Sequence, residues 1–176
     1  MVIFENIGMR AIEYDDLELM LQWRNDENIR KYFREYREFA LSQKREWYES
    51  MIKSSSFEMF LIIDLKENEP IGVAGITYID WVNRHGDVHF YIGKNGEWID
   101  DVYAPVAIKM ILNYGFNVLN LNKLWTEIYE IDTKKNQFFM SLGFSIDANL
   151  REHYYWEGKY YSSHLLSLLR KEFTIE

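Results

Sequence analysis

The sequence predicts an α/β protein of the α+β type, with helices on both faces of a mixed, mostly antiparallel sheet. Three apolar segments, 57–65, 71–80 and 87–93, are separated by the polar turns "KENEP" and "WVNRHG", a pattern typical of an antiparallel meander. The helical segment "PVAIKMILNYGF" then leads to an alternating segment at 123–130, and such a crossover normally connects parallel strands. Because the 176 residues contain no repeat, low-complexity tract or Pro/Gly linker, we expect a single domain, 1–176.

The N-terminal third is predicted to be mainly helical. The segment "MRAIEYDDLELMLQWRND" opens with a short strand, after which Asp15 or Asp16 caps a helix. One face of that helix carries the apolar residues Leu17, Met20, Leu21 and Trp23. A second helix is predicted in "ALSQKREWYESMIKS", with Ser42 as its N-cap.

The C-terminal half is predicted to hold two helices and three strands. In the helix that starts at Pro105, only Lys109 and Asn113 form a polar stripe, so we expect most of it to be buried. A shorter helix in "DTKKNQFFMSLGF" is expected to be capped by Asp132 and ended by Gly143. The tail reads as a hairpin that turns at Glu157–Gly158.

Composition excludes several classes of function. The net charge of −8 argues against nucleic acids and anionic membranes, which require basic surfaces; it suits a cationic substrate, or serves solubility alone. The chain has no cysteine, which excludes disulfides and thiol nucleophiles, and its four histidines lack metal-ligand spacing, so no metal is expected. No signal peptide or apolar stretch of membrane-spanning length is visible, so we expect a cytoplasmic location.

Several segments together resemble the GNAT N-acetyltransferase superfamily. They are "YGFNVLNLNKLWTEIYEIDTKKNQFFMSLGF", "LREHYYWEGKYYSSHLLSLL", "WRNDENIRKYF" and "PIGVAGITYID…RHGDVHFYIG". The likeness covers nearly the whole chain and is greatest to the branch with ribosomal-protein, polyamine and amino-sugar acetyltransferases. It implies that acetyl-CoA binds where two parallel strands splay apart, with its pyrophosphate on the N-terminus of the following helix. An amine would attack the thioester directly.

The pyrophosphate turn departs from the family pattern, which has Gln or Arg, two residues, Gly, one residue, and Gly or Ala. The aligned residues are Ile99, Val102 and Ala104, and only the last one fits. Asp100 and Asp101 would repel a pyrophosphate, or they would favourably cap the helix. We therefore expect a degenerate turn. If acetyl-CoA binds there, the resemblance assigns its phosphates to the backbone N–H groups of Val102, Tyr103 and Ala104.

The resemblance implies further contacts with the acetyl-CoA co-substrate. The pantetheine arm would lie along the backbone of Phe90, Tyr91 and Ile92. Asp132 stands where the family usually has an Asn that contacts the CoA arm, although it would also serve as a helix cap. Phe139 stands where many relatives have a Tyr that protonates the leaving thiolate; it cannot donate a proton and would equally suit a core position.

Candidates for the base and the acceptor pocket come from other segments. Asp87 and His89 alternate onto one face of their strand; a histidine that titrates near neutral pH is the natural base, and relatives sometimes use an acidic residue on this strand. Both would also suit ordinary strand positions. The resemblance places the "WRN" residues at the acceptor, and Glu127 is a candidate partner for its ammonium group. The acceptor candidates are therefore Trp23, Arg24, Asn25 and Glu127.

The sequence thus predicts an acetyl-CoA-dependent N-acetyltransferase that acts on a primary amine by direct attack. The acceptor would be a protein N-terminus, an amino-sugar nucleotide or a polyamine. The alternative is a non-catalytic GNAT-fold binding or regulatory module that has lost acetyl-CoA chemistry. Aromatic residues in the tail would allow a homodimer.

Overall fold

The computed structural model describes residues 1–174, whose strands form one sheet in the order β1-β2-β3-β4-β5-β6-β8-β7. Every neighbouring pair is antiparallel except β5 and β6, which are parallel. This confirms the mixed, mostly antiparallel class and the crossover. The strands are β1 (Val2–Phe4), β2 (Ile7–Ala11), β3 (Glu58–Asp64), β4 (Glu69–Asp80), β5 (His85–Ile92), β6 (Lys123–Tyr129), β7 (Ser145–Trp156) and β8 (Lys159–Leu169).

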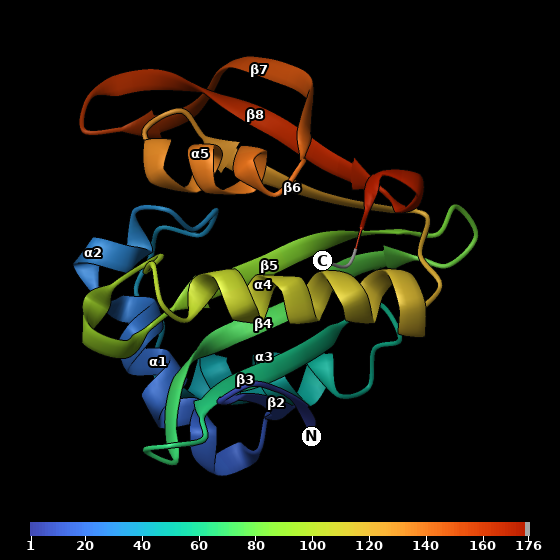
Figure 1. Ribbon diagram of the computed structural model, residues 1–176. Helices are drawn as coiled ribbons and strands as arrows, with labels where there is room; N and C mark the ends of the chain where they lie inside the picture. Colours follow the sequence, from blue (N-terminus) through green and yellow to red (C-terminus); the bar gives the residue numbers. More distant parts are fainter. Residues whose placement is uncertain (175–176) are drawn as a thin grey trace.

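Helices lie on both faces of the sheet. Figure 1 shows α4 crossing in front of β4 and β5, while α1 and α3 lie behind the sheet. The α-helices are α1 (Leu17–Asn25), α2 (Glu27–Arg30), α3 (Leu41–Met51), α4 (Ala104–Asn113) and α5 (Thr133–Ser141). None of the helices in residues 1–174 is long and apolar enough to cross a membrane.

The C-terminal elements follow the predicted boundaries closely. Helix α4 is buried apart from Lys109 and its flanks, as its single polar stripe indicated. The Asp132 side chain accepts a hydrogen bond from the Lys135 N–H, which confirms it as the cap of α5. Gly143 has a φ of +91° after that helix, and Glu157–Gly158 separates β7 from β8.

In the N-terminal third, one strand was missed and one helix cap was wrong. The short strand predicted at the start of "MRAIEYDD" is β2, and it forms a hairpin with β1, which was not predicted; β1 is exposed on both faces, so no alternation of polar and apolar residues marked it. Ser42 does not cap α3, because the helix begins at Leu41 after Ala40. Instead, the side-chain oxygen of Gln43 accepts a hydrogen bond from the backbone N–H of Ala40, the residue that precedes the helix.

The parallel strands β5 and β6 diverge after a short contact. They pair only where His85, Gly86 and Asp87 face Lys123, Leu124 and Trp125. Residues 88–92 of β5 remain bonded to β4 but not to β6, whereas β6 continues along β8. Where the two strands splay apart, the edge of β5 that faces β6 therefore has no strand paired with it.

Candidate functional site

A cavity of about 320 Å³ lies beside the splayed strands. Its lining comes from β3, β4, β5 and β6, from α1 and α3, and from the segment 32–39 that connects α2 to α3. Much of the lining is aromatic, with Phe33, Trp47, Phe57, Tyr91 and Trp98 among the residues that face the space. A cavity of this size and character is typical of a site for a small organic ligand.

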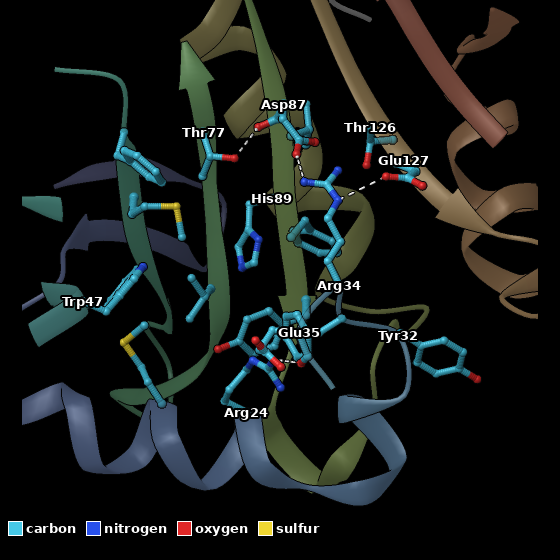
Figure 2. A pocket seen from close by; sticks show the side chains of 18 of the residues that line it. Arg24, Tyr32, Arg34, Glu35, Trp47, Thr77, Asp87, His89, Thr126 and Glu127 are labelled. Carbon is cyan, nitrogen blue, oxygen red and sulfur yellow. Dashed lines mark hydrogen bonds and ion pairs between the residues drawn. The ribbon is translucent and has the colours of Figure 1, made fainter. Parts of the chain in front are cut away.

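Two carboxylates and one arginine meet at one end of this cavity (Figure 2). Arg34 Nη1 lies 2.7 Å from Asp87 Oδ2 on β5, and Arg34 Nε lies 3.3 Å from Glu127 Oε2 on β6. The Ser163 hydroxyl donates to Glu127 Oε1 at 2.7 Å, and His153 Nε2 lies 3.6 Å from the same oxygen. The two strands thus hold a pair of acids around a single cation.

The Asp87 carboxyl is tuned toward neutral pH. Burial is the largest influence and raises the pKa of Asp87 to about 6, although Arg34 and Lys135 oppose it. At pH 7 the group is therefore mainly ionised, yet it is far more basic than an ordinary Asp. A group with a pKa near the working pH is suited to proton transfer.

His89 has the opposite character. It lines the cavity on the same face of β5 as Asp87, and its ring lies 6.0 Å from that of Phe33. Burial, assisted by nearby cations of which Lys135 is the strongest, lowers the pKa of His89 to about 3. The ring is therefore uncharged at neutral pH, and at this pKa it is a weaker base than Asp87.

Two cations that form no ion pair within residues 1–174 line the other part of the cavity. Arg24 on α1 and Lys44 on α3 each have only 8% of their surface exposed. The Arg24 guanidinium lies 4.1 Å from the centroid of the Phe33 ring, and Lys44 Nζ lies 3.7 Å from that of Trp47. Burial lowers the pKa of Arg24 to about 10 and that of Lys44 to about 7.

The turn before α4 contains its own anion. Asp100 Oδ1 accepts hydrogen bonds from the backbone N–H groups of Tyr103 at 2.9 Å and Ala104 at 2.7 Å. These N–H groups are among those a phosphate would use at a helix N-terminus. The sequence left two functions open for the acidic pair, and in this structure Asp100 caps the helix while Asp101 lies in solvent near Lys134.

The unpaired edge of β5 is also partly covered. The Ile92 N–H donates to the Trp98 carbonyl at 3.0 Å, and Lys135 Nζ lies 3.5 Å from the Phe90 carbonyl oxygen. Asp132 fixes this arrangement, because it accepts from the Trp98 indole N–H at 2.6 Å. A pantetheine arm that follows β5 must therefore displace the Trp98 segment and Lys135 from these backbone groups.

Only some of the predicted site residues come together. The cavity is lined by Arg24, Asp87, His89, Phe90, Tyr91 and Glu127. Trp23 packs against Tyr91 without lining the cavity, and Asn25 holds the backbone of Phe39 through two hydrogen bonds. The cavity lining does not include Ile92, Val102, Tyr103, Ala104 or Asp132. Phe139 is fully buried against Phe138 and Phe144.

Three charged residues of the site were missed from the sequence. Arg34 lies in a run of mixed charge and Lys135 lies in a short polar helix, so no apolar pattern singles out either residue. Lys44 carried a detectable signal, because it falls on the stripe formed with Trp47, Tyr48 and Met51 at helical spacing. A lysine in such a stripe is a candidate for a buried charge.

The comparisons with known proteins agree with this architecture. Residues 6–145 match the family model of the acetyltransferase (GNAT) domain. An uncharacterized N-acetyltransferase, p20, from Bacillus licheniformis is 28% identical over 174 residues, which cover 97% of this chain and 96% of that protein. The spermidine N(1)-acetyltransferase of Escherichia coli (strain K12) is 24% identical over 171 residues, which cover 97% of this chain and 90% of that protein.

A solved structure has the same fold. The crystal structure of spermidine N-acetyltransferase from Vibrio cholerae in complex with CoA and spermine superposes with a TM-score of 0.87. Sequence identity is 23%, and the match covers 95% of this chain and 97% of that one.

Proposed function

This chain belongs to the GNAT acetyltransferase family, and we propose that it transfers an acetyl group from acetyl-CoA to a primary amine. The observation that carries the proposal is the pair of carboxylates, Asp87 and Glu127, which surround a cation at the splay of β5 and β6. The relatives reported above are named as N-acetyltransferases, so the comparisons do not favour a non-catalytic module.

In the proposed mechanism the amine takes the place between the carboxylates that the Arg34 guanidinium holds now. Asp87, ionised above about pH 6, accepts one proton of the bound ammonium group and leaves a neutral amine. The amine nitrogen forms a C–N bond to the acetyl carbonyl carbon as the C–S bond breaks, and Glu127 stabilises the positive charge that develops on the nitrogen. The nitrogen then loses its second proton to the departing thiolate, which leaves as the CoA thiol. Because thiols have a pKa of about 8.5, the thiolate can leave without a protein acid, and Phe139 need not donate.

The donor side fits part of acetyl-CoA. The edge of β5 that β6 leaves unpaired suits a pantetheine arm lying along Phe90, Tyr91 and Ile92, with Asp132 and Phe139 behind it. The turn at Val102, Tyr103 and Ala104 does not fit a pyrophosphate as it stands, because Asp100 already occupies two of its N–H groups. We therefore infer that the pantetheine arm supplies most of the donor affinity.

The proposal extends to the location and the oligomeric state of the protein. Acetyl-CoA is abundant in the cytoplasm, which supports the expected location. The exposed tail residues Tyr155 and Tyr160 support a homodimer formed through the β7–β8 hairpin. Size-exclusion chromatography with light scattering tests the dimer, since a monomeric mass at working concentration contradicts it.

The transfer is tested by release of CoA thiol from acetyl-CoA in the presence of a panel of primary amines. We expect turnover with at least one amine, and Asp87→Asn should lower kcat/KM by about 10²–10⁴-fold, as loss of a general base does. Glu46→Gln removes an exposed carboxylate of α3 and should leave the rate unchanged. Absence of both thiol release and CoA binding would refute the transferase, whereas an unchanged rate in Asp87→Asn would refute only the choice of base.

A further inference from the structure

Neither of the two buried cations of the cavity forms an ion pair within residues 1–174, although the Glu35 carboxylate acts on Arg24 from a distance. Within residues 1–174, the Lys44 side chain takes part in no hydrogen bond or ion pair and contacts the Trp47 ring, and Arg24 Nη1 is buried without a hydrogen-bond partner. Buried charges are normally paired, because the loss of hydration is costly. Lys44 relieves part of this cost by losing its proton near pH 7, whereas Arg24 stays charged, and its unpartnered Nη1 is a binding position for a ligand.

The acids near them are already committed elsewhere. The Glu35 carboxylate is bound by Arg37, whose Nη2 and Nε lie 2.7 and 2.9 Å from its oxygens. Asp87 and Glu127 share Arg34. The part of the cavity around Arg24 and Lys44 is therefore electropositive, while the end at Asp87 and Glu127 is acidic.

Both cations are held in fixed positions. The other Arg24 nitrogen, Nη2, donates to the Glu35 carbonyl oxygen, and its guanidinium lies between the rings of Phe33 and Phe39, at 4.1 and 4.9 Å from their centroids. Lys44 lies over Trp47. A guanidinium held by the Glu35 carbonyl, with its Nη1 free to donate, together with an ammonium group, is a prepared site for a carboxylate or phosphate.

We propose that the acceptor carries an anionic group as well as its primary amine, and that Arg24 and Lys44 bind this group while Asp87 and Glu127 receive the amine. The assignment of the amine rests on the proposed function, whereas the binding of the anion does not. A polyamine such as spermidine has no anionic group and would leave both cations unpaired.

The two ends of the cavity set the spacing between the charges. Figure 2 shows Arg24 beside α1, far along β5 from the group formed by Asp87, Arg34 and Glu127. Tyr91, whose ring packs against the Phe33 ring that Arg24 also contacts, is four residues beyond Asp87, and four residues of a strand span roughly 13 Å. The amine and the anion are therefore separated by several bonds, as in an ω-amino acid or an amino-sugar phosphate, rather than adjacent as in an α-amino acid.

Matched pairs of small amines test the anion site by calorimetric titration without any donor. One pair is 6-aminohexanoate and hexylamine, and the other is glucosamine 6-phosphate and glucosamine; the first probes a carboxylate and the second a phosphate. We expect at least one anionic member to bind tenfold or more tightly than its partner. That preference should fall to about onefold in Arg24→Gln and in Lys44→Met, and it should persist in Lys53→Met, which removes an exposed lysine.

Proton uptake on anion binding distinguishes a Lys44 that contacts the anion from a Lys44 that only supports the fold. The charged or titratable groups that interact with Lys44 are Arg24 on α1 and the neutral His89 on β5, while Glu35, bound by Arg37, lines the same cavity. Because the pKa of Lys44 is about 7, a bound anion should raise it and draw in close to one proton at pH 8, but little at pH 6. Titrations in two buffers of different ionisation enthalpy measure this uptake, which should vanish in Lys44→Met.

Each outcome decides the proposal. The anion site would be overturned if hexylamine and glucosamine, or spermidine, bound as tightly as 6-aminohexanoate and glucosamine 6-phosphate or more tightly. If these amines were nevertheless acetylated, the proposed transferase activity would stand. Anion-dependent binding without acetyl transfer would support the site and refute the proposed function. Thermal unfolding checks the folding of each variant; if Arg24→Gln fails to fold, Lys44→Met and the wild-type pairs still decide.

Discussion

The carboxylate of Asp100 should weaken the binding of CoA, and Asp100→Asn isolates its charge. Asparagine keeps an oxygen that can accept from the N–H groups of Tyr103 and Ala104, so the turn should keep its shape. The exposed fraction of Asp100 is only 8%. Its charge therefore acts through a medium less polar than bulk water.

The size of the effect follows from the geometry. A phosphate oxygen that approaches N–H groups now 2.7–2.9 Å from Asp100 would lie about 4 Å from the carboxylate. One charge pair at that distance is worth about 1 kcal/mol in water and about 4 kcal/mol near a protein surface. Allowing for movement of the carboxylate, we expect a gain of about 1.5–3 kcal/mol, which corresponds to a roughly 10–100-fold lower Kd for CoA.

Calorimetric titration with CoA measures this change, and two controls define it. Asp101→Asn alters the net charge equally, but its side chain is 95% exposed, so its Kd should change by less than about threefold. Pantetheine has no pyrophosphate, and its Kd should be the same in wild type and Asp100→Asn. Equal shifts in the two Asp→Asn variants, or no shift in either, would refute the idea that the pyrophosphate approaches α4.

Three further predictions concern the site and its support. The rate should rise with pH through about 6 as Asp87 ionises, and His89→Gln should keep that limb because the pKa of His89 is about 3; a pH–rate profile that lost the limb in His89→Gln would contradict this. The pKa of Lys44 is about 7 in the folded protein, against an ordinary value of 10.5. The unfolded state therefore binds more protons between these two values, and the free energy of unfolding should gain a few kcal/mol from this residue as pH rises. Urea unfolding at pH 7 and 9 should therefore give a smaller pH-dependent gain in Lys44→Met than in wild type. Gly93→Ala would place a Cβ 2.2 Å from the Trp23 ring and should lower the free energy of unfolding by about 1–3 kcal/mol. A urea-unfolding midpoint equal to that of wild type would contradict this.

The fold could be predicted because its signals are local. The turns that divide β3, β4 and β5, the apolar face of α4 and the cap at Asp132 each depend on neighbouring residues, and the structure has them where the sequence indicated. The hairpin of β1 and β2 was missed because an exposed edge strand has no buried face to mark it. Sequence patterns report burial of apolar side chains, and β1 buries none.

The charges of the site could not be predicted in the same way. Arg34 meets Asp87 across 53 residues and Glu127 across 93 residues, and nothing in the intervening sequence fixes that contact. His89 looked like the natural base because its ordinary pKa is near 6.5, but burial among cations lowers that pKa, while burial raises that of Asp87. Which group is suited to accept a proton depends on the cavity, and the cavity forms only in the folded chain.

At two places in the site, a charged side chain of the protein occupies the position that a charged group of a substrate would take. Asp100 supplies the anion for the N-terminus of α4, and Arg34 supplies the cation between Asp87 and Glu127, so a donor phosphate and an acceptor amine must each compete with a group of the protein. Arg24 and Lys44 have no such substitute within residues 1–174. A ligand anion there displaces nothing and relieves the repulsion between two buried cations. The strongest electrostatic selection among acceptors should therefore come from their anionic end, while the amine end, common to every acceptor of this reaction, discriminates little.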